Sequence, residues 1–334
     1  MLWNIVGHEW AVRLLQAGVA QDHLKHAYLF TGPEGVGKRT LVNELARALL
    51  CANIADGVAC GQCRNCLLAA KGHHPDLFTV EPILSGKRVR AEKIKIDPIR
   101  QLIYDVVLRP VEAKCRVARL LRFDAANDEA MNAFLKTLEE PPANVLILLT
   151  AARADDLLPT IVSRCEVINL RPLPIETVRE ALITRWLVPA EQAALLAALS
   201  GGRLGWAVRM HHDEAALEER AHKLNDLLML VSASRVQRFA YAEKLARDGS
   251  TDQIQAALDL WVSVWRDVLL ASAQASAPLT NPDRTIEIQH LAEHLPPAAV
   301  RDIVNVIRHT GELLERNVNA RLALEVMLLD WPRV

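Results

Sequence analysis

A glycine-rich loop between an apolar stretch and a helix-like stretch constrains the fold of this chain more than any other feature. The apolar stretch covers residues 26–30, and leucines at helical spacing follow the loop over residues 41–49. Glycines let backbone N–H groups surround a phosphate, while a helix N-terminus and a lysine add favourable charge. The pattern predicts an α/β domain descended from nucleotide-binding proteins, with these candidate nucleotide-binding residues: Gly32, Gly35, Gly37, Lys38 and Thr40.

The residue after the lysine departs from this pattern. In such loops a Ser or Thr hydroxyl at that position ligates Mg²⁺, whereas here the position holds Arg39. A guanidinium cannot ligate a cation and repels it, and Thr40 lies one position late, about 100° further around a helix. Two interpretations stay open: the loop still binds a nucleotide such as ATP, or it is kept only for its turn geometry.

Four of the six cysteines lie close together, at Cys51, Cys60, Cys63 and Cys66. Four thiolates at this spacing suit a tetrahedral Zn²⁺ ion, and the small or polar residues between them suit a tight knuckle. Because a closed site of four cysteines leaves no open position, we expect this zinc to be structural. The alternatives are two disulfides or reduced loop cysteines, which fit a chain without an export signal less well.

Other potential ligands near the cluster are expected to have different roles. His73 and His74 follow it in the sequence, but the cysteines already number four, so we expect these to be loop histidines. Cys115 and Cys165 lie too far along the chain to belong to the cluster, and we expect them to be buried thiols.

The composition narrows the class of protein. The chain has 334 residues, of which 51% are hydrophobic, and a net charge of −1, so it is long enough for two or three globular domains. The near-zero charge argues against tight nucleic-acid binding by the chain alone, although Lys87–Lys95 is a short basic run. No apolar run approaches the ~20 residues of a membrane span and no signal peptide is recognisable, which predicts a cytoplasmic protein without a membrane partner.

Breaks in the pattern divide the chain into three predicted domains. Residues 1–172 form the α/β domain, with the zinc module at 51–66, and a proline-rich stretch ends it. Residues 173–212 are predicted to form a small helical lid. Residues 213–334 are helical throughout by periodicity, and their last helix is apolar on more than one face. Such a helix must be covered, either by the rest of its own domain or by a partner.

Three further motifs carry a resemblance to a known family. Residues 132–142 have the sequence Asn-Ala-Phe-Leu-Lys-Thr-Leu-Glu-Glu-Pro-Pro, residues 163–165 are Ser-Arg-Cys, and Asn317-x-Asn-x-Arg321 precedes the last apolar run. Together with the glycine loop and the cysteine knuckle, these motifs occur in the order typical of AAA+ clamp-loader subunits. Over nearly its whole length, the chain resembles the delta-prime subunit family of the bacterial DNA polymerase III clamp loader.

The resemblance implies a role for Arg164. In this family the Ser-Arg-Cys arginine reaches into the neighbouring subunit's ATP site, so Arg164 is implied to be an arginine finger that acts in trans on a gamma/tau subunit. The implied assembly is a ring of five related subunits, joined through C-terminal collar domains. Its partners are gamma/tau and delta subunits, and within the DNA-directed DNA polymerase III holoenzyme it loads the sliding clamp on primer-template DNA. Glu139 and Glu140 are expected to support the same subunit interface.

The family pattern also implies that this subunit does not hydrolyse ATP by itself. In hydrolysing members an acidic pair after the second core strand holds Mg²⁺ and activates water, but the corresponding positions here are Leu121 and Arg122. Asp124 is the nearest acid. Thr150 occupies the position that senses the γ-phosphate, whereas the position of a sensing arginine holds Gly205. Whether the glycine loop binds ATP therefore stays open, but no intrinsic ATPase activity is expected.

Two alternatives remain from the sequence. An ATP-hydrolysing gamma/tau-type subunit would need Asp124 and Thr40 to hold the metal, and Mg²⁺-dependent hydrolysis by the isolated chain would establish it. A zinc-stabilised DNA-binding protein would instead use the basic run Lys87–Lys95. Steep salt dependence of DNA binding by the lone chain would favour that class.

Overall fold

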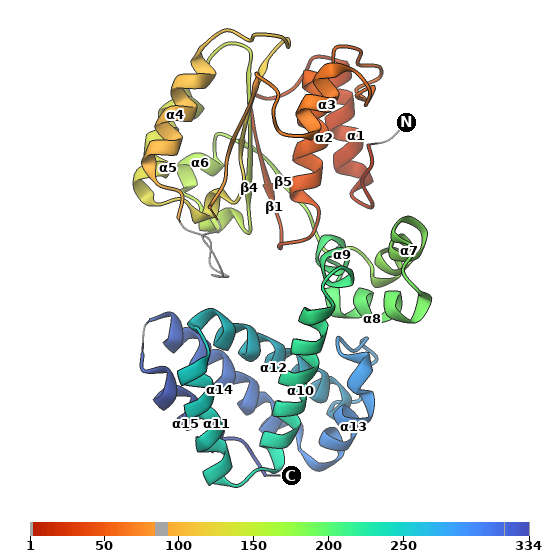
Figure 1. Ribbon diagram of the computed structural model, residues 1–334, viewed down its shortest axis with the longest axis vertical. Coiled ribbons are helices and arrows are strands. Elements are labelled where there is room, and N and C mark those ends of the chain that lie inside the picture. The colour runs from red at the N-terminus through yellow and green to blue at the C-terminus, as the bar shows by residue number, and fades with distance from the viewer. Residues whose placement is uncertain (1–2, 84–92, 317, 334) are drawn as a thin grey trace. The chain divides into compact units, whose positions relative to one another are not determined.

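The computed structural model describes residues 3–83, 93–316 and 318–333, and the chain forms two compact units (Figure 1). The first unit consists of Met1–Thr177 and Gly202–Trp206, and the second of Val178–Gly201 and Ala207–Val334. Most of the basic run Lys87–Lys95 and Asn317 of the terminal motif lie outside the described residues. Each unit has its own hydrophobic core.

The first unit is built on a parallel sheet of five strands in the order β2-β3-β4-β1-β5. The strands are β1 (Ala27–Thr31), β2 (Leu77–Val80), β3 (Arg116–Leu120), β4 (Val145–Ala151) and β5 (Glu166–Asn169). Every residue of β1, β3 and β4 is buried, as expected for strands that helices cover on both faces. Two 3₁₀ turns, η1 (Phe123–Ala125) and η2 (Ala154–Asp156), follow β3 and β4. The predicted α/β fold is confirmed.

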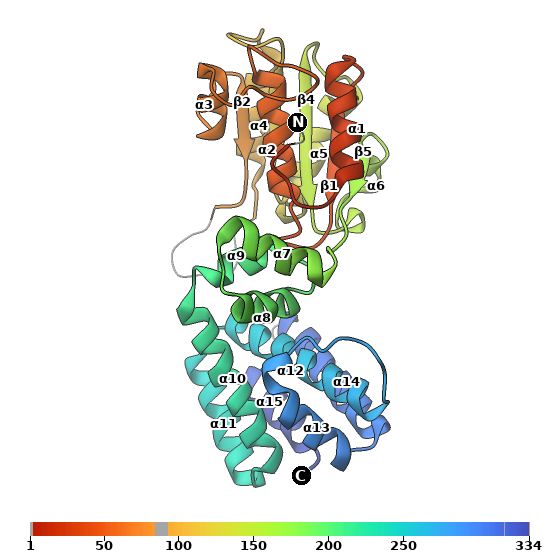
Figure 2. The same cartoon turned by 90° about the vertical axis from the view of Figure 1, so that its right-hand side faces the viewer.

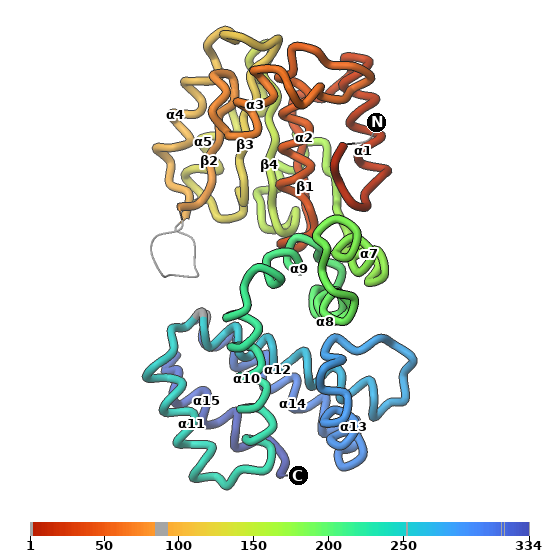
Figure 3. The backbone as a smooth tube through the Cα atoms, turned by 45° about the vertical axis from the view of Figure 1, so that its right-hand side comes forward, coloured from red at the N-terminus to blue at the C-terminus, as the bar shows by residue number. Residues whose placement is uncertain are grey.

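Side chains that alternate along the strands build a separate core on each face of this sheet. Tyr28 and Phe30 of β1 share a core with α1 (Glu9–Ala20) and α2 (Lys38–Leu50), which is followed by α3 (Arg64–Ala70). Leu29 lies in the opposite core with α4 (Ile96–Val107), α5 (Asp128–Glu139) and α6 (Pro159–Val162). Figure 3 shows these two helical layers on either side of the strands. The glycine loop therefore leads into one layer, and the Ser-Arg-Cys turn leaves the other.

Three helices follow β5 along the chain: α7 (Ile175–Trp186), α8 (Ala190–Ser200) and α9 (Leu204–His211). The segment Gly202–Trp206 belongs to the first unit, where the Gly205 N–H donates to the Gly35 carbonyl at 2.8 Å. The start of α9 therefore lies against the glycine loop. The segment Val178–Gly201 belongs to the second unit. The three-domain division, with a lid at residues 173–212, stays a prediction.

From α9 onward the second unit is helical. Its elements are α10 (Glu214–Ser232), α11 (Arg235–Asp248), α12 (Thr251–Ser272), η3 (Pro282–Arg284), α13 (Thr285–His294), α14 (Pro297–Glu315) and α15 (Ala320–Leu329). Helix α11 packs against α15, and α12 packs against both α13 and α14 (Figure 2). Trp331 packs edge-on against the fully buried Trp261 and Trp265, with ring centroids 5.5 and 5.6 Å apart. One core thus links the last helix to α12, the longest helix of this unit.

A buried arginine joins the ends of two helices in this unit. Arg238 is 4% exposed, and all five of its N–H donors point to backbone carbonyls. The acceptors, at 2.6–3.0 Å, are Leu230, Val231, Leu328, Trp331 and Pro332. The first two lie at the end of α10 and the others at or beyond the end of α15. Because helix ends leave carbonyls without intrahelical partners, Arg238 caps both ends at once.

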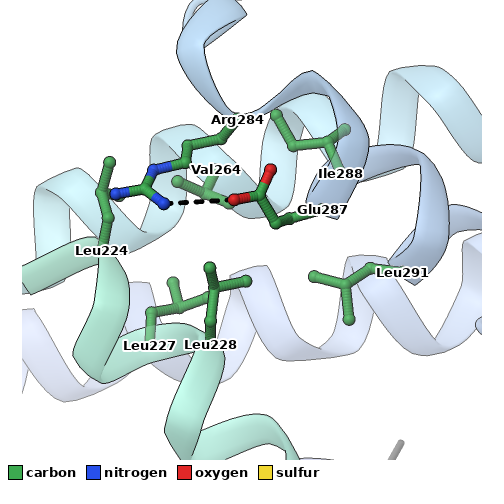
Figure 4. A pocket seen from close by; sticks show the side chains of 8 residues that line it. All are labelled: Leu224, Leu227, Leu228, Val264, Arg284, Glu287, Ile288 and Leu291. Carbon is green, nitrogen blue, oxygen red and sulfur yellow. Dashed lines mark hydrogen bonds and ion pairs between the residues drawn. The ribbon is translucent and has the colours of Figure 1, made fainter. Parts of the chain in front are cut away.

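Helix α13 covers the bundle beside α10 and α12 (Figure 4). Arg284 and Glu287 form an ion pair at 3.1 Å over a small recess, and the recess is lined by apolar side chains: Leu224, Leu227, Leu228, Val264, Ile288 and Leu291. The recess is part of the core rather than a ligand site. Within the described ranges, every helix is too short or too polar to cross a lipid bilayer.

Candidate functional site

The glycine loop joins the end of β1 to the start of α2, as predicted. Gly32, Gly35 and Gly37 have φ angles of 137°, 81° and 119°, which side-chain-bearing residues rarely adopt. Space is restricted as well: a Cβ on Gly32 would lie 2.3 Å from the Leu170 carbonyl oxygen, and one on Gly35 would lie 2.8 Å from the Trp206 nitrogen. The loop therefore keeps the backbone shape of a phosphate-binding turn.

Lys38 closes this loop on itself. Its ammonium group donates to the Gly32 carbonyl and, at 3.0 Å, to the Pro33 carbonyl. Burial lowers the pKa of Lys38, and the carboxylates of Asp124 and Glu34 oppose that shift. A phosphate in this loop would compete with two backbone carbonyls for the lysine.

Arg39 occupies the position where a magnesium ligand is expected, and its positive charge is paired with a carboxylate. Its guanidinium contacts the Glu81 carboxylate, just after β2, at 2.9 and 3.2 Å. Thr40, one residue further on, is exposed. Mg²⁺ requires oxygen ligands, and Arg39 offers none. The glycine loop thus retains its shape without its hydroxyl ligand.

The end of β3 also lacks the acidic pair of a hydrolysing site. Leu121 is buried, and the exposed Arg122 donates its N–H to the Thr150 hydroxyl at 2.8 Å. The hydroxyl predicted to sense a phosphate therefore already has a backbone partner. Asp124 lies in η1, and one of its carboxylate oxygens is buried without a hydrogen-bond partner. Asp124 acts electrostatically on Lys38. It lies beyond Leu121 and Arg122, the two positions at which the acidic pair is expected.

Arg164 lies on the turn that follows α6, and its guanidinium is anchored on its own unit. Nη1 donates to the Thr160 carbonyl at 2.7 Å and to the Ser163 hydroxyl at 3.3 Å. Nη2 forms an ion pair with the Glu139 carboxylate at 2.8 Å. One third of the Arg164 side chain (33%) stays exposed, so part of the guanidinium remains open to another molecule.

Two cysteines outside the cluster differ from their predicted burial. Cys115 and Cys165, predicted to be buried thiols, are both half-buried. Each packs against the rim of a core instead of lying inside it, Cys115 on the α1–α2 face and Cys165 on the α5–α6 face. Burial nevertheless raises the pKa of Cys115 to about 11 and that of Cys165 to about 12. Both groups are therefore protonated thiols at neutral pH.

The four predicted zinc ligands come together at the end of α2. The Sγ of Cys51 is 3.6 Å from that of Cys60 and 3.9 Å from that of Cys63, and the Sγ atoms of Cys60 and Cys66 are 3.9 Å apart. Tetrahedral coordination at a Zn–S distance of about 2.3 Å separates ligand sulfurs by about 3.8 Å, whereas disulfide sulfurs lie about 2.05 Å apart. All six cysteines are free. The distances thus fit a metal ion and not two disulfides.

The chain around these sulfurs also suits a metal. Backbone N–H groups of Cys60, Cys63 and Cys66 donate to Sγ atoms at 3.3–3.4 Å, and such bonds favour the thiolate form that binds metals. Cys51 is the C-terminal cap of α2, and Cys63 is the N-terminal cap of α3. A bound ion would therefore connect the two helix ends. Over the ranges that the structure describes, neither histidine that follows the cluster joins its group of ligands.

The sequence analysis did not predict several polar contacts near the site. Asp76 is fully buried and accepts three backbone N–H groups from residues 111–113 at 2.7–2.8 Å. Arg119, inside β3, donates to the Thr79 hydroxyl and to the Asn43 amide oxygen. These contacts fix β2, β3 and α2 relative to one another. A charged residue in a strand sequence does not reveal such distant partners.

The parallel sheet, the glycine loop without metal ligands and the Ser-Arg-Cys turn together define a subunit with the clamp-loader AAA+ fold. A family model described as DNA polymerase III, delta subunit, matches residues 7–174. A second, described as DNA polymerase III, delta subunit, C terminal, matches residues 214–333. The chain belongs to the delta-prime subunit family of DNA polymerase III.

Curated relatives agree with this assignment. DNA polymerase III subunit delta' of Pseudomonas aeruginosa is 34% identical over 322 residues, which cover 95% of this chain and 94% of the relative. The Escherichia coli delta' subunit is 30% identical, covering 98% of this chain and 93% of the relative. DNA polymerase III subunit tau/gamma of Haemophilus influenzae is 27% identical, but the match covers only 48% of that longer protein. The predicted resemblance is confirmed.

Proposed function

We propose that this chain is a non-hydrolysing subunit of the DNA polymerase III clamp loader. Its membership of the delta-prime family supports this function. The proposed partners are gamma/tau and delta subunits in a cytoplasmic ring, which places the sliding clamp on primer-template DNA. Residues 213–334, as the collar domain, would join the ring. The chain thus takes part in DNA replication within the polymerase holoenzyme without turning over ATP itself.

The observation that carries this proposal is the geometry of Arg164. Its guanidinium is held at one side by Thr160, Ser163 and Glu139, while a third of the side chain remains exposed. In trans, this open part would contact the transferring phosphoryl group of ATP bound to a gamma/tau subunit. There the positive charge stabilises the transition state, an effect on the order of 10³–10⁵ in rate in other phosphoryl-transfer systems.

The degenerate nucleotide site supports the absence of intrinsic hydrolysis. Arg39 pairs with Glu81 at the position of the hydroxyl ligand, and Leu121 and Arg122 replace the acids that would hold Mg²⁺ and activate water. The glycines and Lys38 can still hold a nucleotide phosphate if the lysine exchanges its carbonyl partners. The alternative of a hydrolysing gamma/tau-type subunit would depend on the exposed Thr40, and the geometry does not favour it.

We assign the cysteine cluster a structural Zn²⁺ ion. Cys51, Cys60, Cys63 and Cys66 would fill all four tetrahedral positions, which leaves none for a substrate. The ion would supply a cross-link between the end of α2 and the start of α3. The near-zero net charge of the chain argues against the alternative of a zinc-stabilised DNA-binding protein.

The test is ATP turnover by purified gamma/tau and delta subunits with clamp and primed DNA, with this chain added as wild type or as Arg164→Ala. We expect the wild type to stimulate turnover and the alanine variant to lose that stimulation while the ring still assembles. Arg100→Ala is a matched control, because Arg100 is an exposed arginine on α4 of the same unit. Equal stimulation by wild type and Arg164→Ala would leave this chain as a purely structural ring member.

A further inference from the structure

We propose that Glu139 is the positioning residue of the arginine finger. It sets the direction in which the Arg164 guanidinium faces the nucleotide of the neighbouring subunit. The inference rests on the function proposed for Arg164 and adds a second residue, from a different helix, to the apparatus that acts in trans.

The distribution of hydrogen bonds over the guanidinium is the first argument. Arginine has five N–H donors in a fixed plane. Three contacts engage Arg164: Nη1 with the Thr160 carbonyl and the Ser163 hydroxyl, and Nη2 with Glu139 at 2.8 Å. Among the described residues, two donors of Arg164 therefore have no partner, one on Nη2 and one on Nε. These two are what Arg164 can offer to phosphate oxygens in a partner's site.

The origin of the three contacts is the second argument. Thr160 and Ser163 belong to the same short segment as Arg164, so they fix the guanidinium only relative to its own turn. Within the part of the chain that the structure describes, Glu139 is the one partner of Arg164 outside that segment. The carboxylate thus ties the finger to a different element, the last residue of α5.

Helix α5 is a rigid support for this contact. Phe134 and Leu138 of α5 lie in the same buried core as Ile161 of α6, and all three are at most 1% exposed. Glu139 follows Leu138 directly, so its backbone position is determined by core packing. A carboxylate fixed in this way can hold the long, flexible arginine side chain in one direction.

The exposure of the pair indicates orientation rather than stability as its role. The side chains are 33% and 49% exposed, and ion pairs this open to water contribute little to folding. Water and salt also screen the carboxylate, so its charge takes little from the field that Arg164 exerts on a phosphate. Position, by contrast, strongly affects catalysis, because a displacement of about 1 Å can lower a rate about 10²-fold. The orienting effect therefore outweighs the charge that Glu139 subtracts.

The experiment uses the reconstituted clamp loader with clamp and primed DNA, and measures the Arg164-dependent part of ATP turnover, which is the wild-type rate minus the Arg164→Ala rate. We expect Glu139→Gln to lower the kcat of this part about tenfold, with KM for ATP changed less than about twofold. Glu139→Asp keeps the charge on a shorter side chain and should give an intermediate kcat. Glu129→Gln, an exposed carboxylate at the other end of α5, should behave as wild type.

A double variant separates positioning from a general effect on folding. If Glu139 acts through Arg164, Glu139→Gln should cause no further loss in the Arg164→Ala background. A further loss there, an unchanged kcat in the single Glu139→Gln variant, or a raised kcat would each overturn the role of Glu139 while Arg164 keeps its own. If Arg164→Ala itself turns over ATP like the wild type, the function proposed for Arg164 fails, and the inference fails with it.

Discussion

Two loops of the first unit each present a cation suited to phosphate, and the chain holds these cations in opposite ways. Lys38 in the glycine loop is half-buried, and its ammonium group is bound to carbonyls of its own loop. Arg164 is anchored from one side by a neighbouring helix and keeps donors open to solvent. The first cation is satisfied by carbonyls of its own loop, whereas the second keeps a third of its side chain exposed.

The comparison shows that the backbone shape of a loop and its chemistry can have separate physical causes. Steric contacts alone require glycine at Gly32 and Gly35, because a Cβ would clash with Leu170 and Trp206. Packing therefore preserves the loop even where Arg39 has replaced the magnesium ligand. The exposed part of the Arg164 side chain, by contrast, is not fixed by core packing.

The largest expected effect compares the two cations directly. In the reconstituted complex, Arg164→Ala should lower ATP hydrolysis at the partner's site on the order of 10³-fold, because it removes charge from the transition state. Lys38→Ala should change turnover less than about twofold, since we expect no hydrolysis at the glycine loop of this chain. Single-turnover hydrolysis measures both. A similar loss from Lys38→Ala would show that the glycine loop also contributes to turnover, so that Lys38 and Arg164 would not differ in their effect on the rate.

A smaller effect should show that different parts of the first unit support the two loops. The cysteine cluster supports the end of α2, the helix that follows the glycine loop, and the opposite core supports the Ser-Arg-Cys turn. Cys63→Ser removes one of the four proposed zinc ligands and should loosen the end of α2, with amide hydrogen exchange over residues 51–70 at least about 100-fold faster. Residues 157–166 are supported by the opposite core and should keep their protection. Cys115→Ser, which changes a thiol outside the cluster, is the control. Equal loosening of both segments would mean that the metal supports the whole sheet.

A still smaller effect should show whether Arg39 prevents Mg²⁺ from assisting ATP binding at the glycine loop. Arg39→Thr replaces a repelling cation with a hydroxyl, so Mg²⁺ should tighten ATP binding by the isolated variant about tenfold, as judged by calorimetry with and without the metal. Hydrolysis should stay absent, because Leu121 and Arg122 supply no acid. Glu81→Gln, which only removes the partner of Arg39, should show no such metal dependence. Hydrolysis by the Arg39→Thr chain would contradict the assignment of the missing acids.

The smallest expected effect concerns the ion pair between Arg39, at the start of α2, and Glu81, just after β2. The side chains of Arg39 and Glu81 are 65% and 43% exposed. Glu81→Ala should therefore change the free energy of unfolding by less than about 1 kcal/mol. Urea denaturation of the isolated chain measures this. A much larger loss would show that the pair holds the closed loop in place.

The sequence predicted features whose residues are close along the chain. The glycine loop, its helix and the four clustered cysteines have short spacings, so local geometry determines them and the structure bears them out. The strand order and the partners of Arg39 and Arg164 depend on packing between distant segments: Glu81 lies 42 residues from Arg39. The prediction that Cys115 and Cys165 are fully buried was wrong, because both are half-buried. The reason is related: the hydrophobicity of a residue does not tell whether it lies inside a core or at its rim.

Arg238 gives the carboxyl end of this chain an importance that its position would not suggest. All five donors of this buried arginine depend on carbonyls from two helix ends, and three of those carbonyls belong to Leu328, Trp331 and Pro332. A carboxypeptidase that trimmed the chain past Trp331 would strip a buried cation of acceptors, which is among the costliest defects in a protein interior. Resistance to such trimming would therefore report how tightly the helical unit is closed.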